Sequence, residues 1–426
     1  MEALMELLEQ GVSPVQAVQV IGRRLARAGY TRLDYGRAWD LKPGGRYYLT
    51  HHDTSLFAFA LPKNINAENG MPPVRLAAAH TDFPCLKIKP SADVYSCGYR
   101  QLNTEVYGGA ILNTWLDRPL GIAGRAAVRG ENAFMPRMCY FAPDKNLLTI
   151  PNLAIHMNRE VNKGVELNRQ TDLLPLLGLG EKEESDSFLQ YLAKELGTVP
   201  EDILDFELTV YCRESPQYIG LKEEFLSAPR LDNMTSCAAL VEALTDAGET
   251  ESVNLIALFD HEEVGSRTKQ GAGSDFLHRL TARILEACGE RARAEELLYR
   301  SMLLSVDVAH GLHPNHPGKT DITNKPVLGG GFCIKEASAQ TYATDCLAVA
   351  IVCEICESAG IPYQKFVNRS DMPGGSTLGS IASSYLPVPT VDVGVPILAM
   401  HSARELMCGK DQTALREMLH RYFSYC

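Results

Sequence analysis

Apolar runs alternate with amphipathic runs along the second half of the chain. Short apolar runs typical of buried strands cover 253–259, 303–306 and 391–395, and helix-like patterns cover 237–247, 276–288 and 341–359. An earlier run, 74–79, has the same strand character, and residues 1 to about 28 form an amphipathic, helix-like opening. This alternation predicts an α/β fold with a mainly parallel central sheet flanked by helices.

The pattern changes between about residues 90 and 219. Short β-like runs are interrupted there by Gly108-Gly109, by 118–121 and by 128–130, and a Glu-rich stretch follows at 181–187. We therefore expect a discontinuous α/β domain made of residues 1–90 and 220–426, interrupted by a β-rich domain at 91–219. A length of 426 residues agrees with two domains because it exceeds the usual size of one.

Composition narrows the class of protein. Hydrophobic residues make up 45% of the chain and charged residues 22%, which is ordinary for a globular protein. A net charge of -11 argues against sequence-independent nucleic-acid binding, which needs a basic surface. No basic secretory leader begins the chain, and no apolar stretch is long enough to cross a bilayer. We expect a cytoplasmic protein without nucleic-acid or membrane partners.

The cysteines support the same compartment. All twelve are scattered among apolar positions, without the compact spacing of a disulfide scaffold, so we expect reduced, mostly buried thiols. Cys353 and Cys356 form a C-x-x-C pair, but they lie inside the apolar helical run 341–359 and no second pair accompanies them. Core packing therefore explains this pair better than a zinc or redox site.

Histidine and acidic residues collect where the predicted strands end. Ligands bind beyond the carboxyl ends of strands in open α/β sheets, so these positions are expected to meet. Two histidines with three or four carboxylates could hold two adjacent divalent cations, with one carboxylate bridging them. Mixed nitrogen and oxygen ligands suit Zn²⁺, with Mn²⁺ or Co²⁺ as alternatives. The positions are His80, Asp82, Asp232, Glu262, Glu263, Asp307 and His401.

Glu262 and Glu263 follow the apolar run 253–259 directly. Adjacent side chains on extended backbone point to opposite sides, so one carboxylate could bind metal while the other handles a proton. Each position also has a purely structural explanation: a charged turn for the glutamates, a helix cap for Asp232 and a hydrogen-bonded histidine for His80. Their coincidence at five chain positions favours the metal site.

Six motifs, in order along nearly the whole chain, closely resemble the M18 family of metalloaminopeptidases. They are 80–82 (HTD), 227–233 (SAPRLDN), 260–266 (DHEEVGS), 305–311 (SVDVAHG), 371–379 (DMPGGSTLG) and 399–405 (AMHSARE). The resemblance implies a proteolytic α/β domain interrupted by a β-rich dimerisation domain. It also implies dimers that assemble into a tetrahedral dodecamer, with active sites facing an enclosed chamber.

The resemblance assigns roles to the strand-end residues. Asp232 would bridge two divalent cations, with His80 and Asp307 completing one coordination shell and Glu263 and His401 the other. Glu262 would be the general base, and Asp82 would lie behind His80 and orient its ring. The implied reaction is hydrolysis of the N-terminal residue from peptides with a free N-terminus.

Substrate-binding residues follow from the same resemblance. His156 matches a histidine that reaches the neighbouring subunit's active site, and the alternative is a surface histidine. Lys335 matches a lysine that meets acidic side chains in the family's aspartyl aminopeptidases, and the alternative is a solvated lysine. Asp371 and Gly375 are expected to help bind the substrate amine, although turn chemistry explains Asp371 equally well.

A histidine-rich segment follows Asp307. The resemblance implies that His310 and His313 line the substrate pocket, whereas His316 is expected to belong to a loop. Three other functions stay open: an M18-like enzyme preferring neutral residues, a two-metal deacylase acting on another bond, and a non-catalytic scaffold or cargo particle. The complete set of ligands and base argues against the scaffold.

Overall fold

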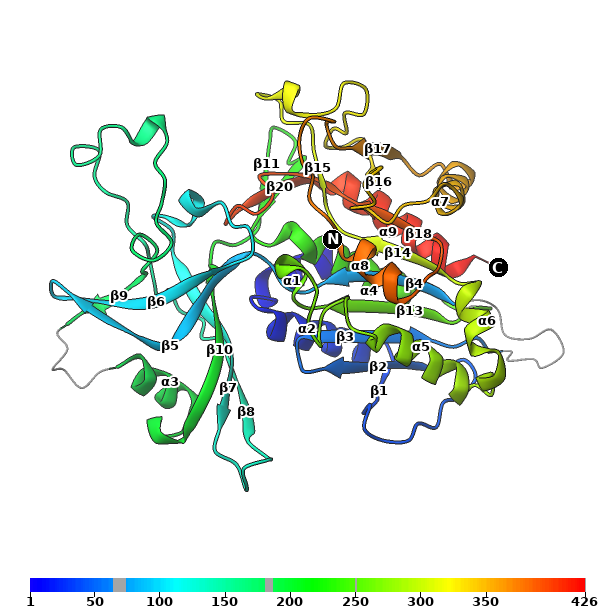
Figure 1. The fold of residues 1–426 in the computed structure, drawn as a ribbon, viewed down its shortest axis with the longest axis horizontal. Helices are drawn as coiled ribbons and strands as arrows, with labels where there is room; N and C mark the ends of the chain where they lie inside the picture. The colour runs from blue at the N-terminus through cyan, green and yellow to red at the C-terminus, as the bar shows by residue number, and fades with distance from the viewer. Residues whose placement is uncertain (64–73, 181–186, 250, 426) are drawn as a thin grey trace. The chain divides into compact units, whose positions relative to one another are not determined.

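The computed structural model describes residues 1–63, 74–180, 187–249 and 251–425, which form two units (Figure 1). The first unit contains Met1–Asp82, Pro216–Met400 and the chain from Glu405 onward. The second contains Phe83–Ser215 together with His401–Arg404. The short return to the second unit at 401–404 was not expected from the sequence, which placed all of 220–426 in one domain.

A nine-stranded sheet lies at the centre of the first unit. The three central pairings, β13 with β4, β4 with β14 and β14 with β18, are parallel, and antiparallel pairs occur toward both edges. This sheet confirms the predicted α/β class with a mainly parallel centre. In spatial order its strands are β1 (Thr31–Arg32), β2 (Arg46–His51), β3 (Ser55–Ala60), β13 (Asn254–Phe259), β4 (Arg75–His80), β14 (Met302–Val306), β18 (Thr390–Gly394), β16 (Phe332–Glu336) and β17 (Tyr363–Val367).

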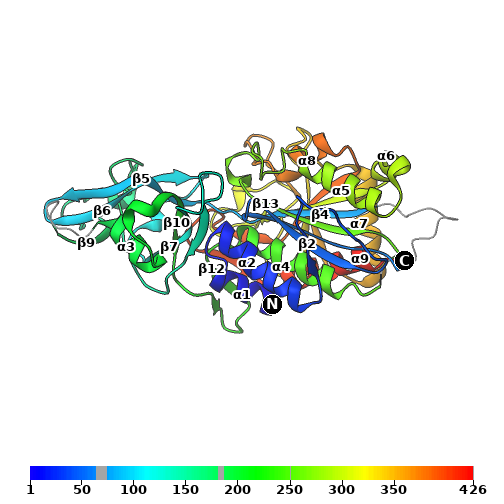
Figure 2. The same cartoon turned by 90° about the horizontal axis from the view of Figure 1, so that it is seen from below.

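Strand β4 shows how the sheet divides two apolar cores. Ala77 and Ala79 belong to one core, whereas Leu76 and Ala78 belong to the other, because successive side chains on a strand point to opposite faces. Its small side chains let helices pack against both faces. Helices α1 (Glu2–Gln10), α2 (Pro14–Arg27), α4 (Leu231–Asp246), α7 (Cys346–Ala359) and α9 (Gly409–Ser424) cover the first face, and α5 (Phe276–Ala287), α6 (Ala294–Tyr299) and α8 (Leu378–Tyr385) cover the second (Figure 2).

Several helices begin or end away from their predicted limits, and α4 begins at Leu231 rather than at residue 237. The amphipathic opening is two helices rather than one, because Gly11 ends α1 and Pro14 occupies the first turn of α2. Helix α7 begins at Cys346 instead of residue 341. The Asp345 carboxylate caps it by accepting a hydrogen bond from the Ala348 amide. Among the described residues, no helix combines the length and apolar character that crossing a membrane requires.

A smaller sheet of five short strands also belongs to the first unit. Its order is β11 (Gln217–Ile219), β12 (Phe225–Ala228), β20 (Glu405–Cys408), β19 (Pro396–Leu398) and β15 (Ala309–His310). Strand β12 leads directly into α4, and β15 follows β14 after two residues. Strand β12 therefore holds the start of segment 229–232, and β15 holds the end of segment 307–308. Both segments carry acidic residues.

The second unit is built on an antiparallel sheet. Its strands are β8 (Arg137–Phe141), β7 (Leu120–Val128), β10 (Ile203–Cys212), β5 (Cys85–Ser96), β6 (Tyr99–Tyr107) and β9 (Leu176–Leu179), and α3 (Phe188–Leu196) adds one helix. Every pairing in this sheet is antiparallel. The β-rich character predicted for the insertion is confirmed.

Candidate metal centre

Three neighbouring parallel strands carry most of the predicted metal-site residues to one edge of the central sheet. His80 is the last residue of β4 and pairs with Phe259, the last residue of β13. Glu262 and Glu263 follow β13, and Asp307 follows β14, which pairs with β4 on its other side. Parallel strands end at a common edge, so residues distant in the sequence are brought together as predicted.

His80 lies at the centre of a buried acidic cluster. Its Nε2 atom is 3.4 Å from Asp232 Oδ1 and 3.5 Å from Asp307 Oδ1, and its Nδ1 atom is 3.3 Å from Asp82 Oδ1. All four side chains are nearly inaccessible to solvent. Possible ligand atoms of His80, Asp232 and Asp307 lie within 4.8 Å of one another, which is close enough for a single cation to reach all three.

Glu262 and Glu263 lie in one turn of 3₁₀ helix, Glu262–Val264, rather than on extended backbone. The assumption that these two side chains lie on extended backbone was therefore wrong. His261, just before the pair, has a φ of 64°, and this left-handed residue turns the chain out of β13. Successive residues of a 3₁₀ helix still point about 120° apart, so the two carboxylates face different directions. Possible ligand atoms of His80, Glu262 and Glu263 form a second group, within 4.8 Å of one another.

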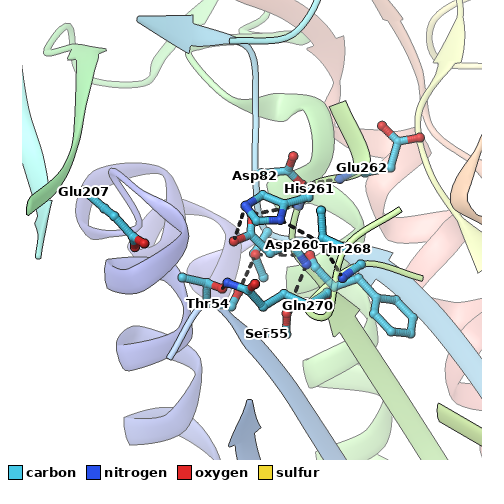
Figure 3. A network of polar contacts seen from close by, with 12 residues as sticks. Thr54, Ser55, Asp82, Glu207, Asp260, His261, Glu262, Thr268 and Gln270 are labelled. Carbon is cyan, nitrogen blue, oxygen red and sulfur yellow. Dashed lines mark hydrogen bonds and ion pairs between the residues drawn. The ribbon is translucent and has the colours of Figure 1, made fainter. Parts of the chain in front are cut away.

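Backbone and side-chain hydrogen bonds fix this turn (Figure 3). The Asp82 carboxylate accepts from the Glu262 amide through Oδ1 and from the Glu263 amide through Oδ2, both at 3.1 Å. On the other side of the turn, the His261 Nδ1 atom lies 2.8 Å from the Thr268 hydroxyl. The Asp260 amide donates to the Gln270 carbonyl at 3.2 Å. These contacts hold both glutamates without using their carboxylates.

The pKa values of the cluster reflect burial first and crowded negative charge second. Burial raises the pKa of Glu262 to about 8; His80 opposes the shift, and Asp307 and other acids add to it. Burial, followed by the charges of Asp232 and Glu262, raises the pKa of Glu263 well above its ordinary value. Burial would lower the pKa of His80, but its acidic neighbours raise it well above the usual range. A divalent cation would neutralise this cluster and restore ionised carboxylates, so the donor set fits a metal.

Glu405 supports Asp232, a contact that the sequence motifs did not predict. Its Oε2 atom accepts a hydrogen bond from the Asp232 amide at 3.0 Å, and both residues are buried. Asn233, joined to Asp232 by a cis peptide bond, donates from Nδ2 to the Val306 carbonyl at 2.9 Å. An acidic residue opening the otherwise apolar strand β20 was the available signal for Glu405.

Lys335 is buried in β16, with an exposed fraction of 1%. Its ammonium donates to the Val308 carbonyl at 3.0 Å, lies 3.7 Å from Asp307 Oδ2 and sits 5.0 Å from the centre of the Tyr342 ring. Burial would lower the pKa of Lys335, but Asp307 and Asp392 raise it, so the side chain stays cationic. A solvated lysine, the alternative left open by the sequence, does not describe this residue.

The remaining predicted pocket residues are exposed. His310 and Gly375 are accessible in the first unit, and the Asp371 carboxylate forms hydrogen bonds with both Arg369 Nε and Nη2. The rings of His313 and His316 lie 5.0 Å apart in an exposed loop.

His156 is exposed in a loop of the second unit. His401 also belongs to the second unit, so its place among the ligands stays a prediction.

Comparisons with known proteins agree with these motifs. The family model described as "Aminopeptidase I zinc metalloprotease (M18)" matches residues 7–423. A probable M18 family aminopeptidase 2 from Clostridium novyi is 42% identical over 412 residues, covering 96% of this chain and 94% of the relative.

Solved structures have the same fold. The chain matches a structure of the Ape4 and Nbr1 complex with a TM-score of 0.93 and 32% identity, covering 99% of this chain and 84% of that one. It also matches the mApe1 dodecamer of S. cerevisiae with a TM-score of 0.82 and 24% identity, covering 100% and 96% of the two chains.

Proposed function

This chain belongs to the M18 family of aminopeptidases, and we propose that it removes the N-terminal residue from peptides at a site holding two divalent cations. The observation that carries the proposal is the buried cluster around His80, where Asp232 and Asp307 both approach one imidazole nitrogen. Zn²⁺ is the preferred cation because the ligands mix nitrogen with carboxylate oxygen, and Mn²⁺ or Co²⁺ would also suit them.

The proposed ligand set shares Asp232 between the cations. His80 and Asp307 complete the first set, and their proximity to Asp232 supports this assignment. Glu263 and His401 complete the second set, an assignment that rests on the sequence motifs. Asp82 would orient His80 through Nδ1, leaving Nε2 for the cation.

Glu262 is the proposed general base. When bound, the two cations supply Lewis acidity, which acidifies water and stabilises negative charge on the scissile carbonyl. Glu262 takes the proton of the attacking water and then delivers it to the departing amine. Its position supports this role, because Glu262 directly precedes the proposed ligand Glu263 and the Asp82 carboxylate holds its backbone amide.

Recognition of the substrate's ends uses further residues. Asp371 and Gly375 are proposed to assist binding of the α-amine, and His310 and His313 to line the pocket. We propose that His156 acts in the active site of a neighbouring subunit, in dimers that assemble into a tetrahedral dodecamer. The dodecameric relative supports the assembly, and its fold matches across this whole chain. A cytoplasmic location remains part of the proposal.

The buried Lys335 supports a preference for N-terminal Asp or Glu. An ammonium that stays charged inside the protein attracts a carboxylate and penalises an apolar side chain. One observation favours the alternative, a preference for neutral residues: Asp307 already lies 3.7 Å from the ammonium and balances its charge.

A substrate panel tests the proposal. The chelated protein, reloaded with Zn²⁺, Mn²⁺ or Co²⁺, would be assayed on Asp-, Glu- and Leu-p-nitroanilide and on N-acetylated Asp-p-nitroanilide. We expect metal-dependent cleavage of the free-amine substrates, with Asp and Glu faster than Leu. Faster Leu cleavage would overturn the acidic preference alone. Preference for the acetylated substrate would indicate a deacylase, and no cleavage of any substrate would indicate a scaffold.

A further inference from the structure

The segment 401–404 is held by the β-rich second unit. The Ile111 amide donates to the His401 carbonyl at 3.0 Å, and the His401 Nδ1 atom lies 3.2 Å from the Gly109 carbonyl oxygen. The Ala403 amide donates to the Thr114 hydroxyl at 2.9 Å. Three contacts within four residues therefore connect this return segment to the chain between β6 and β7.

We propose that Gly109 and Thr114 are positioning residues for His401. The inference rests on the proposed role of His401 as a metal ligand. A carbonyl acceptor at Nδ1 selects the tautomer in which Nδ1 carries the proton, so the Nε2 lone pair is available for a cation. Gly109 and Thr114 would thus contribute to metal affinity through His401.

The backbone of His401 needs such support. Its φ of 67° lies in the left-handed region, which costs a non-glycine residue free energy unless its surroundings hold it there. The Ile111 amide and the Gly109 carbonyl engage the main chain and the ring of the same residue, which fixes both.

Gly109 also provides space for the ring. A Cβ atom placed on Gly109 would lie 3.2 Å from His401 Nδ1 and 3.7 Å from Cε1. The first distance is tighter than an ordinary contact, so an alanine would push the imidazole by a few tenths of an ångström. Metal ligands tolerate little displacement, because coordination bonds are short and directional.

The Thr114 hydroxyl group stabilises the same segment because it both donates and accepts a hydrogen bond. It donates to the Ile111 carbonyl at 2.6 Å and accepts from the Ala403 amide at 2.9 Å. Serine can reproduce both bonds, whereas valine has nearly the same shape and can make neither. Comparing Thr114→Ser with Thr114→Val therefore distinguishes the effect of the hydroxyl group from the effect of side-chain volume.

Zinc affinity measures the inference directly. We would titrate the chelated full-length protein with Zn²⁺ against a competing chromophoric chelator, and compare wild type with Gly109→Ala, Gly178→Ala, Thr114→Val and Thr114→Ser. Gly178 lies in β9 of the same unit, and an added Cβ there meets nothing within 4 Å, so Gly178→Ala is the matched control. Circular dichroism and gel filtration would verify the fold and assembly of each variant.

We expect Gly109→Ala to weaken one of two zinc-binding steps about 10-fold, as loss of ligand support typically does, while the other step is unchanged. Thr114→Val should weaken the same step, and Thr114→Ser should restore it. Wild-type affinities in both Gly109→Ala and Thr114→Val would overturn the inference while leaving the proposed function intact. Absence of zinc binding by the wild type would overturn both. If Gly109→Ala fails to fold, the Thr114 pair still decides.

Discussion

The carboxylate of Asp82 accepts a hydrogen bond from the backbone amide of Glu262, at 3.1 Å. The other carboxylate oxygen accepts from the next amide along the chain, and Oδ1 also lies 3.3 Å from His80 Nδ1. One side chain therefore connects two strand ends, that of β4 and that of β13. Asp82 can act on the proposed base and on a proposed ligand without touching substrate.

Asp82→Asn should disturb both connections. An amide nitrogen would replace one oxygen, so one buried backbone donor or His80 Nδ1 would face another donor, at a cost of about 1–3 kcal/mol. We expect metal affinity and kcat each to fall about 10- to 100-fold. Asp40→Asn, an exposed carboxylate paired with Lys42, is the control and should change neither quantity. Metal titration and steady-state kinetics would contradict this account if the Asp82 variant matched the control.

The two adjacent glutamates should respond differently to loss of charge. Glu262→Gln is expected to keep its metal content and lose kcat by roughly 10²- to 10⁴-fold, because a general base contributes about that much. Glu263→Gln should release metal first, since the substitution removes a charged ligand. Metal analysis by mass spectrometry, combined with kinetics on the same preparations, separates the two effects. Full metal and full activity in both variants would exclude the proposed assignment.

Complementation tests whether His156 acts between subunits. His156→Ala and Glu262→Ala proteins would be mixed in equal amounts under conditions that exchange subunits. If the histidine serves the neighbouring site, mixed dimers contain one intact site, and activity should recover to about one quarter of wild type. Each variant incubated by itself is the control. Mixed dimers, verified by mass spectrometry, that show no recovery would place His156 outside the neighbouring active site.

Asp411 should make stability depend on pH. Its buried carboxyl group accepts hydrogen bonds from the Gly329 and Gly331 amides, at 2.7 and 2.8 Å. Burial raises the pKa of Asp411 to about 6 despite these bonds, above the ordinary value of 3.8. Between these values the folded state holds a proton that the unfolded state has lost. The contribution of protonated Asp411 to the free energy of unfolding is thus fully present below pH 3.8. It is lost as the pH rises through about 6.

Thermal unfolding of wild type and Asp411→Asn at several pH values measures this contribution. The midpoint of wild type, relative to the variant, should decline between pH 4 and 6.5 and stay level above pH 7, roughly one unit beyond the folded-state value. Asp40→Asn again serves as the control and should track wild type throughout. A difference that rises with pH would contradict the prediction.

Local patterns in the sequence predicted the central strands well. The runs 253–259 and 303–306 became β13 and β14 almost unchanged, because a strand buried on both faces leaves a continuous apolar run. Polar residues directly after those runs predicted which side chains would meet at the sheet edge. His80 and Asp307 did come together, since parallel strands share that edge, and Asp232 joins them from the start of α4.

Features that depend on distant partners could not be predicted in this way. The burial of Lys335 requires Asp307 and Tyr342, which lie on other elements. The support of Asp232 by Glu405 joins residues far apart in the chain, and the turn at Glu262 depends on the left-handed His261. Hydrophobic periodicity carries no information about such contacts, and residue type marks Glu405 as unusual in an apolar strand without identifying its partner.

The three consecutive alanines that precede His80 set a limit on how this site can change. Ala77, Ala78 and Ala79 are fully or almost fully buried, with helices packed against both faces of their strand. A larger residue at any of them would have to displace a helix or shift the strand, because packed interiors have no spare volume. Any shift would move His80 along with β4. Substitution of an apolar residue that binds neither metal nor substrate can therefore inactivate the site. The small volume of these three side chains is itself a requirement of the proposed chemistry.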